Sequence, residues 1–277
     1  LDINFAFITR DSKILSSLSE LSDAQKFKFE NAISSGVKYS FLYNNQLNKK
    51  VKNPTYFIAK SWLIGPTALA SKVLGLVERD VTTNAITLAG IRYATFFKLQ
   101  GDLRKFFNFI NEQQIAVRTF IGASIPLDKD GVIPFDQLYF VGGANSLRGW
   151  RRRTLGPGSY FNSNDNVDKL GEVKIELSAE YRFPVTSIIK GALFIDGGNI
   201  WTQKPDTDLE GFGSKNFDFG LFYKEFAVSP GIGIRLDFDF FLFRVDFGIP
   251  LKQAYNQYTW RLEPDKTQVN FGVGYPF

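Results

Sequence analysis

The sequence predicts an all-β fold and, within that class, a transmembrane antiparallel β-barrel. Three observations predict it: apolar and polar residues alternate with a period of two, no segment suits a spanning helix, and the expected connections alternate in length. A spanning helix needs roughly 18 uncharged apolar residues, whereas the longest charge-free runs, such as Ser61 to Ser71, contain about a dozen. A helical membrane protein is therefore excluded.

The alternation is clear near the end of the chain. In residues 241–249 one face carries Phe241, Phe243, Val245, Phe247 and Ile249, and the other carries Arg244, Asp246 and Gly248. The same period runs through residues 172–183, 229–238 and 268–277. A soluble β-sandwich also alternates, with its apolar side chains turned inward, and composition alone leaves that alternative open. Strongly aromatic apolar faces, opposite polar faces that combine both signs of charge with Gly, favour a barrel with lipid outside and a wet lumen.

Ten strands are expected, and the connections between them alternate in length. The strands are 2–9, 31–44, 54–64, 87–99, 113–125, 171–183, 189–200, 228–238, 240–250 and 267–277. The long connections are 10–30, 65–86, 126–170, 201–227 and 251–266, and the shorter ones are 45–53, 100–112, 184–188 and 239. Outer-membrane barrels have short turns at one rim and long loops at the other. A soluble sandwich has no reason to keep this difference.

The composition excludes several classes of function. The chain has no His, Cys or Met, so Ser-His-Asp and Cys-His catalysis, imidazole or thiolate metal sites and disulfides are excluded, while Lys- or carboxylate-based catalysis survives. The net charge is +5, but the basic residues are scattered except for Arg151–Arg153. An oxygen-ligand cation site also survives, but we assign no metal site and no cofactor, and the scattered basic residues argue against a nucleic-acid partner. The expectation that the protein is not an enzyme rests on the resemblance described below. The missing Met also predicts a mature form or a piece of a longer protein.

The connection at 126–170 is the longest, with 45 residues. Loops of that length are usually functional or disordered, and this one is too patterned for disorder. Its core is Gly142-Gly143-Ala144-Asn145-Ser146-Leu147-Arg148-Gly149-Trp150, and Leu155-Gly156-Pro157 follows.

This core resembles the sixth extracellular loop of the BamA/TamA superfamily of outer-membrane assembly and translocation barrels. The family core is Gly-Gly-x-x-Ser-Val-Arg-Gly-Tyr/Phe, so Leu147 and Trp150 are mild departures. Residues 179–184 and 194–201 resemble the two strands that follow in the family, and 269–277 resemble an outer-membrane insertion signal that ends in an aromatic residue. The residues around Arg148 and the C-terminal Tyr-Pro-Phe are most similar to those of TamA-like members (TamL), and BamA is nearly as similar.

The resemblance implies a larger barrel. The family barrel has sixteen strands, and the long loop lies between its eleventh and twelfth. Five expected strands precede the loop here and five follow it. We therefore expect residues 1–277 to be the C-terminal ten or so strands of a 16-stranded barrel, without the earlier strands and the periplasmic POTRA domains. A genuine ten-strand product is the alternative.

The resemblance also implies a site. In the family the loop folds back into the lumen and its Arg contacts acidic residues of the wall, which here makes Arg148, Glu180 and Asp196 a loop-to-wall lock. A guanidinium binds carboxylates bidentately and fixes the direction of a loop. Gly142, Gly143 and Gly149 would let the backbone turn and approach the wall; Ser146 and Trp150 complete the motif. In a wet lumen each ion pair would contribute only ~0–1 kcal/mol.

Other interpretations of these charges remain open. Arg148 could be a solvated loop residue, and Glu180 and Asp196 could be generic lumen charges. A solvated cluster is favoured for Arg151–Arg153. Generic lumen positions are expected for Arg118, Arg182, Arg235 and Arg244, all of which lie on polar faces.

The last expected strand, 267–277, has a second implied role. Pro276 removes a ladder donor, so pairing is weak near the end. In the family this strand forms a lateral seam at which client strands add by β-augmentation. The expected seam residues are Asn270, Gly272, Gly274 and Phe277.

The resemblance finally implies a function in the bacterial outer membrane. We expect a non-enzymatic insertase or translocase that aids the assembly or export of client proteins. Its expected partners are outer-membrane or secreted client polypeptides, the lipid bilayer and lipopolysaccharide, and accessory periplasmic or lipoprotein subunits. A passive porin-like channel is the alternative, and an enzyme-carrying barrel is a third possibility that none of these residues supports.

Overall fold

The computed structural model describes residues 2–6, 32–48, 50–66, 78–79, 86–88, 91–128, 133–162, 168–203, 216–238, 240–256 and 259–277. These residues form one 13-stranded sheet and three short 3-10 turns. The strands are β1 (Asp2–Ala6), β2 (Ala32–Asn44), β3 (Thr55–Ile64), β4 (Glu78–Arg79), β5 (Ile86–Leu88), β6 (Ile91–Tyr93), β7 (Phe96–Asn108), β8 (Gln114–Pro126), β9 (Val173–Pro184), β10 (Ile189–Trp201), β11 (Ala227–Asp237), β12 (Leu242–Gly248) and β13 (Gln268–Val273). The 3-10 turns are η1 (Phe135–Gln137), η2 (Phe222–Glu225) and η3 (Pro264–Lys266).

The sheet is almost entirely antiparallel, and its long strands follow the order of the chain. From one edge the order is β13-β12-β11-β10-β9-β8-β7-β3-β2, after which β6, β5 and β4 follow, while β1 pairs with β2. Among the strands of the described residues, β2 and β6 are the one parallel pair. Within the described residues β13 has one partner strand, β12, so its other side is an edge.

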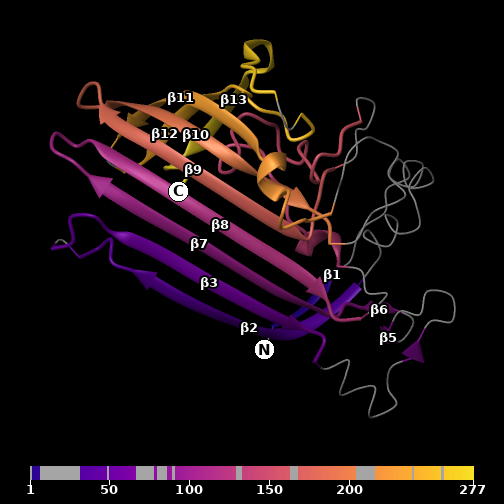
Figure 1. Cartoon of the computed structure of the whole chain (residues 1–277). Coiled ribbons are helices and arrows are strands. Elements are labelled where there is room, and N and C mark those ends of the chain that lie inside the picture. Colours follow the sequence, from indigo (N-terminus) through magenta and orange to yellow (C-terminus); the bar gives the residue numbers. More distant parts are fainter. Residues whose placement is uncertain are drawn as a thin grey trace.

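The connections alternate in length as the sequence predicts (Figure 1). Short turns at 45–54, 109–113, 185–188 and 238–241 lie at one end of the sheet, the turn end. The strand ends that flank the long connections, 65–95, 127–172, 202–226 and 249–267, lie at the other end, the loop end. The predicted asymmetry between the two rims is confirmed.

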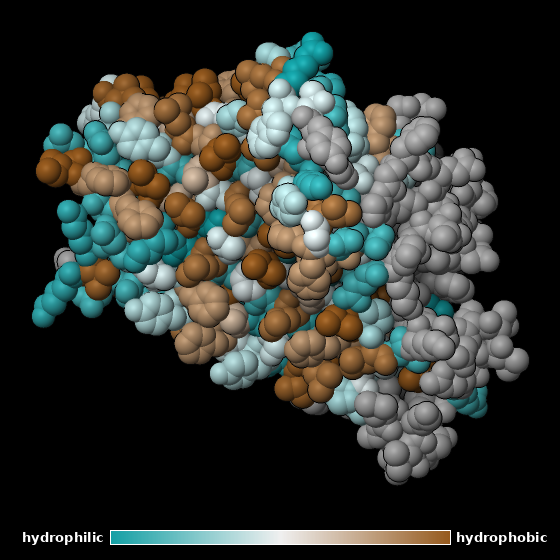
Figure 2. Space-filling model, in the orientation of Figure 1, coloured by the Kyte–Doolittle hydropathy of each residue, from teal (hydrophilic) through white to brown (hydrophobic). Residues whose placement is uncertain are grey.

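The burial pattern of this sheet is the reverse of that of a soluble protein. In β9 the buried side chains include Glu176, Glu180 and Arg182, whereas Leu177 is 44% exposed. The outward faces of β10, β11 and β13 are likewise apolar and exposed. Figure 2 shows apolar side chains spread over the middle of the outer face, with polar side chains toward the turn end. A dry sandwich would bury these apolar faces, so the transmembrane barrel is confirmed as the fold class.

The predicted fourth strand, 87–99, is wrong in its position. The long strand β7 starts at Phe96 and continues to Asn108, through most of the expected turn 100–112. Asp102 and Arg104 alternate with Gly101 and Leu103 and point to the inside, where they pair with each other. Inward charges are compatible with a barrel strand. Short strands β5 and β6 occupy part of the predicted range.

The inside of the curved sheet is packed rather than empty. Val141, Leu147, Trp150 and Leu155 from the connection 127–172 form a buried cluster with Phe120 of β8 and other wall residues. A second cluster joins Ile133 and Leu138 of the same connection to Phe96 and Ile64. Parts of the predicted strands and loops, including 7–31, 129–132 and 204–215, lie outside the described residues. Within the described part of the chain, no helix has the length and apolarity needed to cross a membrane.

Candidate functional site

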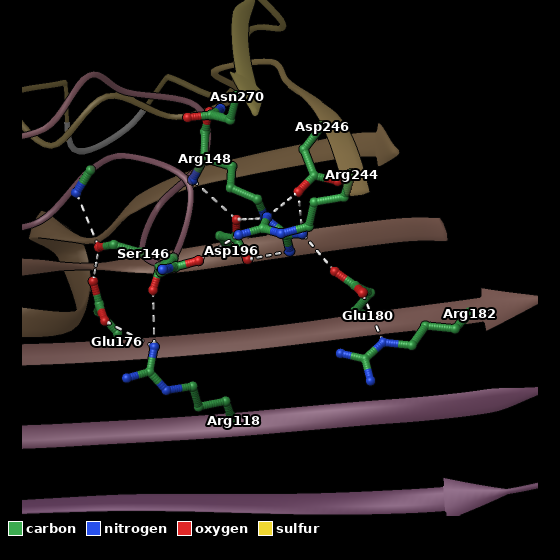
Figure 3. Close-up of polar contacts among 12 residues, drawn as sticks. Arg118, Ser146, Arg148, Glu176, Glu180, Arg182, Asp196, Arg244, Asp246 and Asn270 are labelled. Carbon is green, nitrogen blue, oxygen red and sulfur yellow. Dashed lines mark hydrogen bonds and ion pairs between the residues drawn. The ribbon is translucent and has the colours of Figure 1, made fainter. Parts of the chain in front are cut away.

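The core of the long loop turns sharply at two glycines. Gly142 and Gly143 both have φ of +93°, a conformation that residues with a Cβ rarely adopt. The Gly142 N–H donates to Ser146 Oγ at 3.1 Å, and the Gly143 N–H donates to the carbonyl of Trp150 at 2.8 Å. These bonds close the loop on itself, so Arg148 lies at the tip of a compact turn that points toward the wall (Figure 3).

Arg148 meets both carboxylates that the sequence proposed as its partners. Its Nε and Nη2 donate to the two oxygens of Asp196 at 2.8 and 3.0 Å, and its main-chain N–H reaches Asp196 Oδ2 at 3.1 Å. Its Nη1 donates to Glu180 Oε2 at 2.5 Å. The guanidinium also stacks on Phe194, 3.4 Å from the ring centroid. The fork geometry fixes the direction of the side chain, as a single ammonium would not.

The surroundings of this pair are dry, which corrects the expectation of a wet lumen. The side chain of Arg148 is 1% exposed, and those of Glu180 and Asp196 are 0% exposed. The apolar part of the loop fills the space around the charges and excludes solvent. The estimate of ~0–1 kcal/mol for an exposed pair therefore does not apply, because removing one partner of a buried pair leaves an uncompensated charge.

A third carboxylate, Asp246 of β12, belongs to the same network. Arg148 Nη1 lies 3.5 Å from Asp246 Oδ2, while Arg235 Nη1 and Arg244 Nη1 donate to Asp246 at 2.6 and 2.5 Å. Arg235 and Arg244 are directly opposite each other on β11 and β12. Like charges in that register repel, and Asp246 offsets the repulsion by accepting hydrogen bonds from both.

Glu180 is likewise shared. Besides Arg148 it accepts from Arg182 Nε at 2.8 Å, and Arg235 Nη2 lies 3.1 Å away. Four guanidinium groups and three carboxylates thus form one buried cluster, which we call the arginine network. Its members are Arg148, Arg182, Arg235, Arg244, Glu180, Asp196 and Asp246.

A second contact anchors the loop nearer to the loop end. Ser146 Oγ donates to Glu176 Oε1 of β9. Arg118 of β8 donates to the carbonyl of Asn145 at 3.2 Å and lies 3.7 Å from Glu176. Trp150, the last motif residue, is buried and donates from Nε1 to Gln253 Oε1 at 3.1 Å. The motif therefore contacts β8 and β9 on one side of Arg148 and the connection 249–267 on the other.

Glycines of the wall and the loop allow this close approach. A Cβ on Gly149 would lie 2.5 Å from Cβ of Ser229, and a Cβ on Gly248 would lie 2.4 Å from the carbonyl oxygen of Arg148. Neither position has room for a larger residue without moving the loop, because the atoms that it would meet at Gly248 belong to the main chain.

The predicted seam residues are only partly on a strand. Asn270 and Gly272 lie on β13, whereas Gly274 and Phe277 lie beyond its end at Val273. Gly274 has φ of +77°, and the chain then leaves the sheet edge. Phe277 is buried against Phe106 and Ala116 on the inside of the sheet. The predicted strand 267–277 is therefore too long, because the last residues turn inward.

The sequence missed Asp246 and assigned no role to Arg235, Arg244 and Arg182 beyond a generic place in the lumen. Each lies on the polar face of an alternating segment, which predicted an inward direction correctly. The pairing register, which places Arg235 opposite Arg244, was not available from the pattern. Among the described residues, no group of three acidic, His or Cys side chains could hold a metal ion.

The lipid-facing sheet and the loop bound inside it define an integral outer-membrane β-barrel. The chain belongs to the Omp85 superfamily, whose domain model matches residues 22–277. It is similar to the outer membrane protein assembly factor BamA of Neisseria meningitidis serogroup B, at 33% identity over 81 residues, 27% of this chain and 10% of that protein. The predicted superfamily and the bacterial outer-membrane localisation are confirmed.

A solved structure supports the fold. The crystal structure of BamA from Haemophilus ducreyi lacking POTRA domains 1–3 superposes with a TM-score of 0.60 at 17% identity, over 92% of this chain and 46% of that chain. At this identity the likeness shows the fold alone. The chain spans less than half the length of that structure and a tenth of the curated relative.

Proposed function

We propose that this barrel is the membrane part of a non-enzymatic insertase or translocase, which aids assembly or export of client proteins at the outer membrane. The observation that carries the proposal is the combination of an occupied lumen with a short last strand whose end turns away from the sheet. Arg148 and its partners hold the loop inside the sheet, and β13 is the last strand of the sheet that the described residues form. β13 has only six residues and the chain turns inward after it, so it offers few main-chain groups for pairing on its outer side.

The lock is the proposed role of Arg148, Glu180 and Asp196, and the seam is the proposed role of β13. Client β-strands would add to the edge of β13 through main-chain hydrogen bonds, as in other cases of β-augmentation. Such binding reads little side-chain information, which suits a protein that handles many clients. The similarity to a protein named as an assembly factor supports this direction.

The proposal includes partners and an orientation. The loop end would face the lipopolysaccharide of the outer leaflet and the turn end the periplasm, as in other outer-membrane barrels. Client outer-membrane or secreted polypeptides would meet β13, the lipid bilayer would cover the apolar belt, and accessory periplasmic or lipoprotein subunits would contact the protein from the periplasm. A BamA-like and a TamA-like role both fit this arrangement.

A passive porin-like channel is not favoured. A porin needs an open constriction lined by charges, whereas the charges here pair with each other under a buried loop core. Single-channel recording separates the two functions: large, stable openings would support the porin, and small or transient ones the insertase.

Site-specific crosslinking tests the seam. A photo-reactive residue at Phe271, which is 64% exposed on β13, should capture a client during assembly. Leu177 is the matched control, because it is also apolar and lipid-facing but lies on β9, within the sheet. Capture at Phe271 and not at Leu177 is expected. Equal capture at both positions, or none along β13, would overturn the proposed seam.

A further inference from the structure

The tip of the loop contacts the last two strands as well as the wall at β9 and β10. Asn270 of β13 donates from Nδ2 to the main-chain carbonyl of Arg148 at 2.8 Å. Arg244 of β12 donates from Nη2 to Asn145 Oδ1 of the loop, and from Nε to the carbonyl of Gly274 at 3.0 Å. The loop and the end of the edge strand are therefore joined through two side chains.

These contacts depend on the lock itself. The side chain of Arg148 is fixed by Asp196 and Glu180, so the position of its carbonyl, which Asn270 binds, is fixed as well. Arg244 is oriented by Asp246, which also faces Arg148. Figure 3 shows that Asn270, Asp246 and Arg244 lie close to Arg148. A change that withdraws Arg148 removes the acceptor of Asn270 and alters the charge balance at Asp246.

β12 and β13 each carry a glycine where another part of the protein packs closely: Gly248 faces the loop, and Gly272 faces the Arg244 side chain. A Cβ on Gly272 would meet three atoms of the Arg244 guanidinium at 2.7 to 2.8 Å. A Cβ on Gly248 would meet the main chain of Arg148 and Gly149. The contact between loop and edge is thus shaped on β12 and β13 as well as on the loop.

We propose that Asn270 and Arg244 are positioning residues that couple the Arg148 lock to the edge strand, so that the locked loop holds β13 in place and release of the loop loosens it. The inference rests on the proposed function, because it assigns a control to the edge that receives clients. The coupling does not require a bound client, since all of these contacts lie within the chain. It is reciprocal, so loosening of β13 also weakens the lock.

A double-mutant cycle read by hydrogen exchange tests the coupling. The protein in lipid nanodiscs would be compared as wild type, Asn270→Asp, Arg148→Lys and the double variant, under conditions in which exchange follows the local opening equilibrium. Loss of one such hydrogen bond changes an opening equilibrium about two- to tenfold. Exchange across residues 268–274 should rise by this factor in each single variant and no further in the double variant, because both break the same connection.

Gln268→Glu is the matched control. It is the same amide-to-acid change two residues away on the same face of β13, and Gln268 donates to the carbonyl of Lys266 rather than to the loop tip. It should leave the effect of Arg148→Lys intact. Arg244→Lys supplies a second cycle with Asn270→Asp that does not require Arg148 to be changed, in case Arg148→Lys fails to fold.

Two outcomes would overturn the inference. If the increases in exchange caused by Arg148→Lys and Asn270→Asp multiply in the double variant, the lock and the edge strand open independently. An effect of Gln268→Glu that equals that of Asn270→Asp would show only a general weakening of β13. Client capture at Phe271 is a separate readout: its absence with intact coupling would overturn the proposed function alone, and its presence without coupling would overturn this inference alone.

Discussion

Replacing Arg148 by Lys tests whether the lock acts as a buried fork or as an ordinary lumen charge. Three side-chain hydrogen bonds link Arg148 to carboxylates within 3.0 Å: Nε and Nη2 to Asp196, and Nη1 to Glu180. A Lys keeps the charge but has one compact ammonium, which cannot reproduce the fork to Asp196 and also reach Glu180. About two charge-assisted hydrogen bonds are then lost, at roughly 1.5–3 kcal/mol each.

Partial relaxation of the loop reduces that sum, so we expect Arg148→Lys to lower the free energy of unfolding by about 3 kcal/mol. Breaking a buried ion pair typically costs about 3–5 kcal/mol, whereas an exposed pair is worth about 0–1 kcal/mol. The two readings of the lumen, dry and wet, therefore predict different results from one substitution.

Urea unfolding in lipid vesicles, followed by tryptophan fluorescence, measures this difference. Trp150, two residues from the substitution, is buried in the wild type and reports on the loop. Arg151→Lys is the control, because Arg151 is exposed on the same loop. A loss below 1 kcal/mol for Arg148→Lys, or a loss equal to that of Arg151→Lys, would refute the buried-fork argument.

Three further predictions follow from the structure. Gly248→Ala should displace the loop from the wall and speed tryptic cleavage at the loop, since its Cβ would lie 2.4 Å from the carbonyl oxygen of Arg148, while Gly101→Ala, which meets only Phe57 at 3.8 Å, should not. Leu193→Arg on the lipid-facing side of β10 should reduce stability in vesicles by about 2–4 kcal/mol, and Leu193→Met should leave it nearly unchanged. Burial raises the pKa of Glu225 from 4.5, against the opposing hydrogen bond from Trp201. Its contribution to stability is complete below that value and is lost as the pH rises through the raised pKa, so the wild-type unfolding midpoint should fall with pH more steeply than that of Glu225→Gln; parallel profiles would contradict this.

The alternation of residue types was sufficient to predict most of the fold. Nine of the ten expected strands each overlap one strand of the described structure, although the expected last strand is too long, because a period of two fixes both the strand and the face that each residue presents. The fourth strand was wrong in its position, because β7 continues through Asp102 and Arg104, whose charged side chains point inward. In a barrel the charged face of a strand is the inside face, so charges do not end it.

The motif predicted the centre of the site, and geometry supplied the rest. Arg148, Glu180 and Asp196 could be proposed because they lie in recognisable segments, and the structure brings them together. The place of Asp246 depends on strand register and on the depth to which the loop enters, and neither follows from a pattern along one strand. The exclusion of solvent from these ion pairs could not be predicted either, because it results from the packing of loop residues such as Leu147 against the wall.

The size of the arginine network bears on what it does. Replacing a buried ion pair with well-packed apolar residues is often neutral or stabilising, so a network of this size is weak evidence for stability. Removing one member is costly, however, because Glu180 and Asp246 each neutralise several guanidinium groups at once. The network therefore favours the inserted loop, in which each of the three carboxylates contacts at least one guanidinium group. Intermediate positions would leave charges dry and unpaired. A fork with fixed directions is suited to holding the loop in one position, whereas a purely apolar loop could slide against the wall.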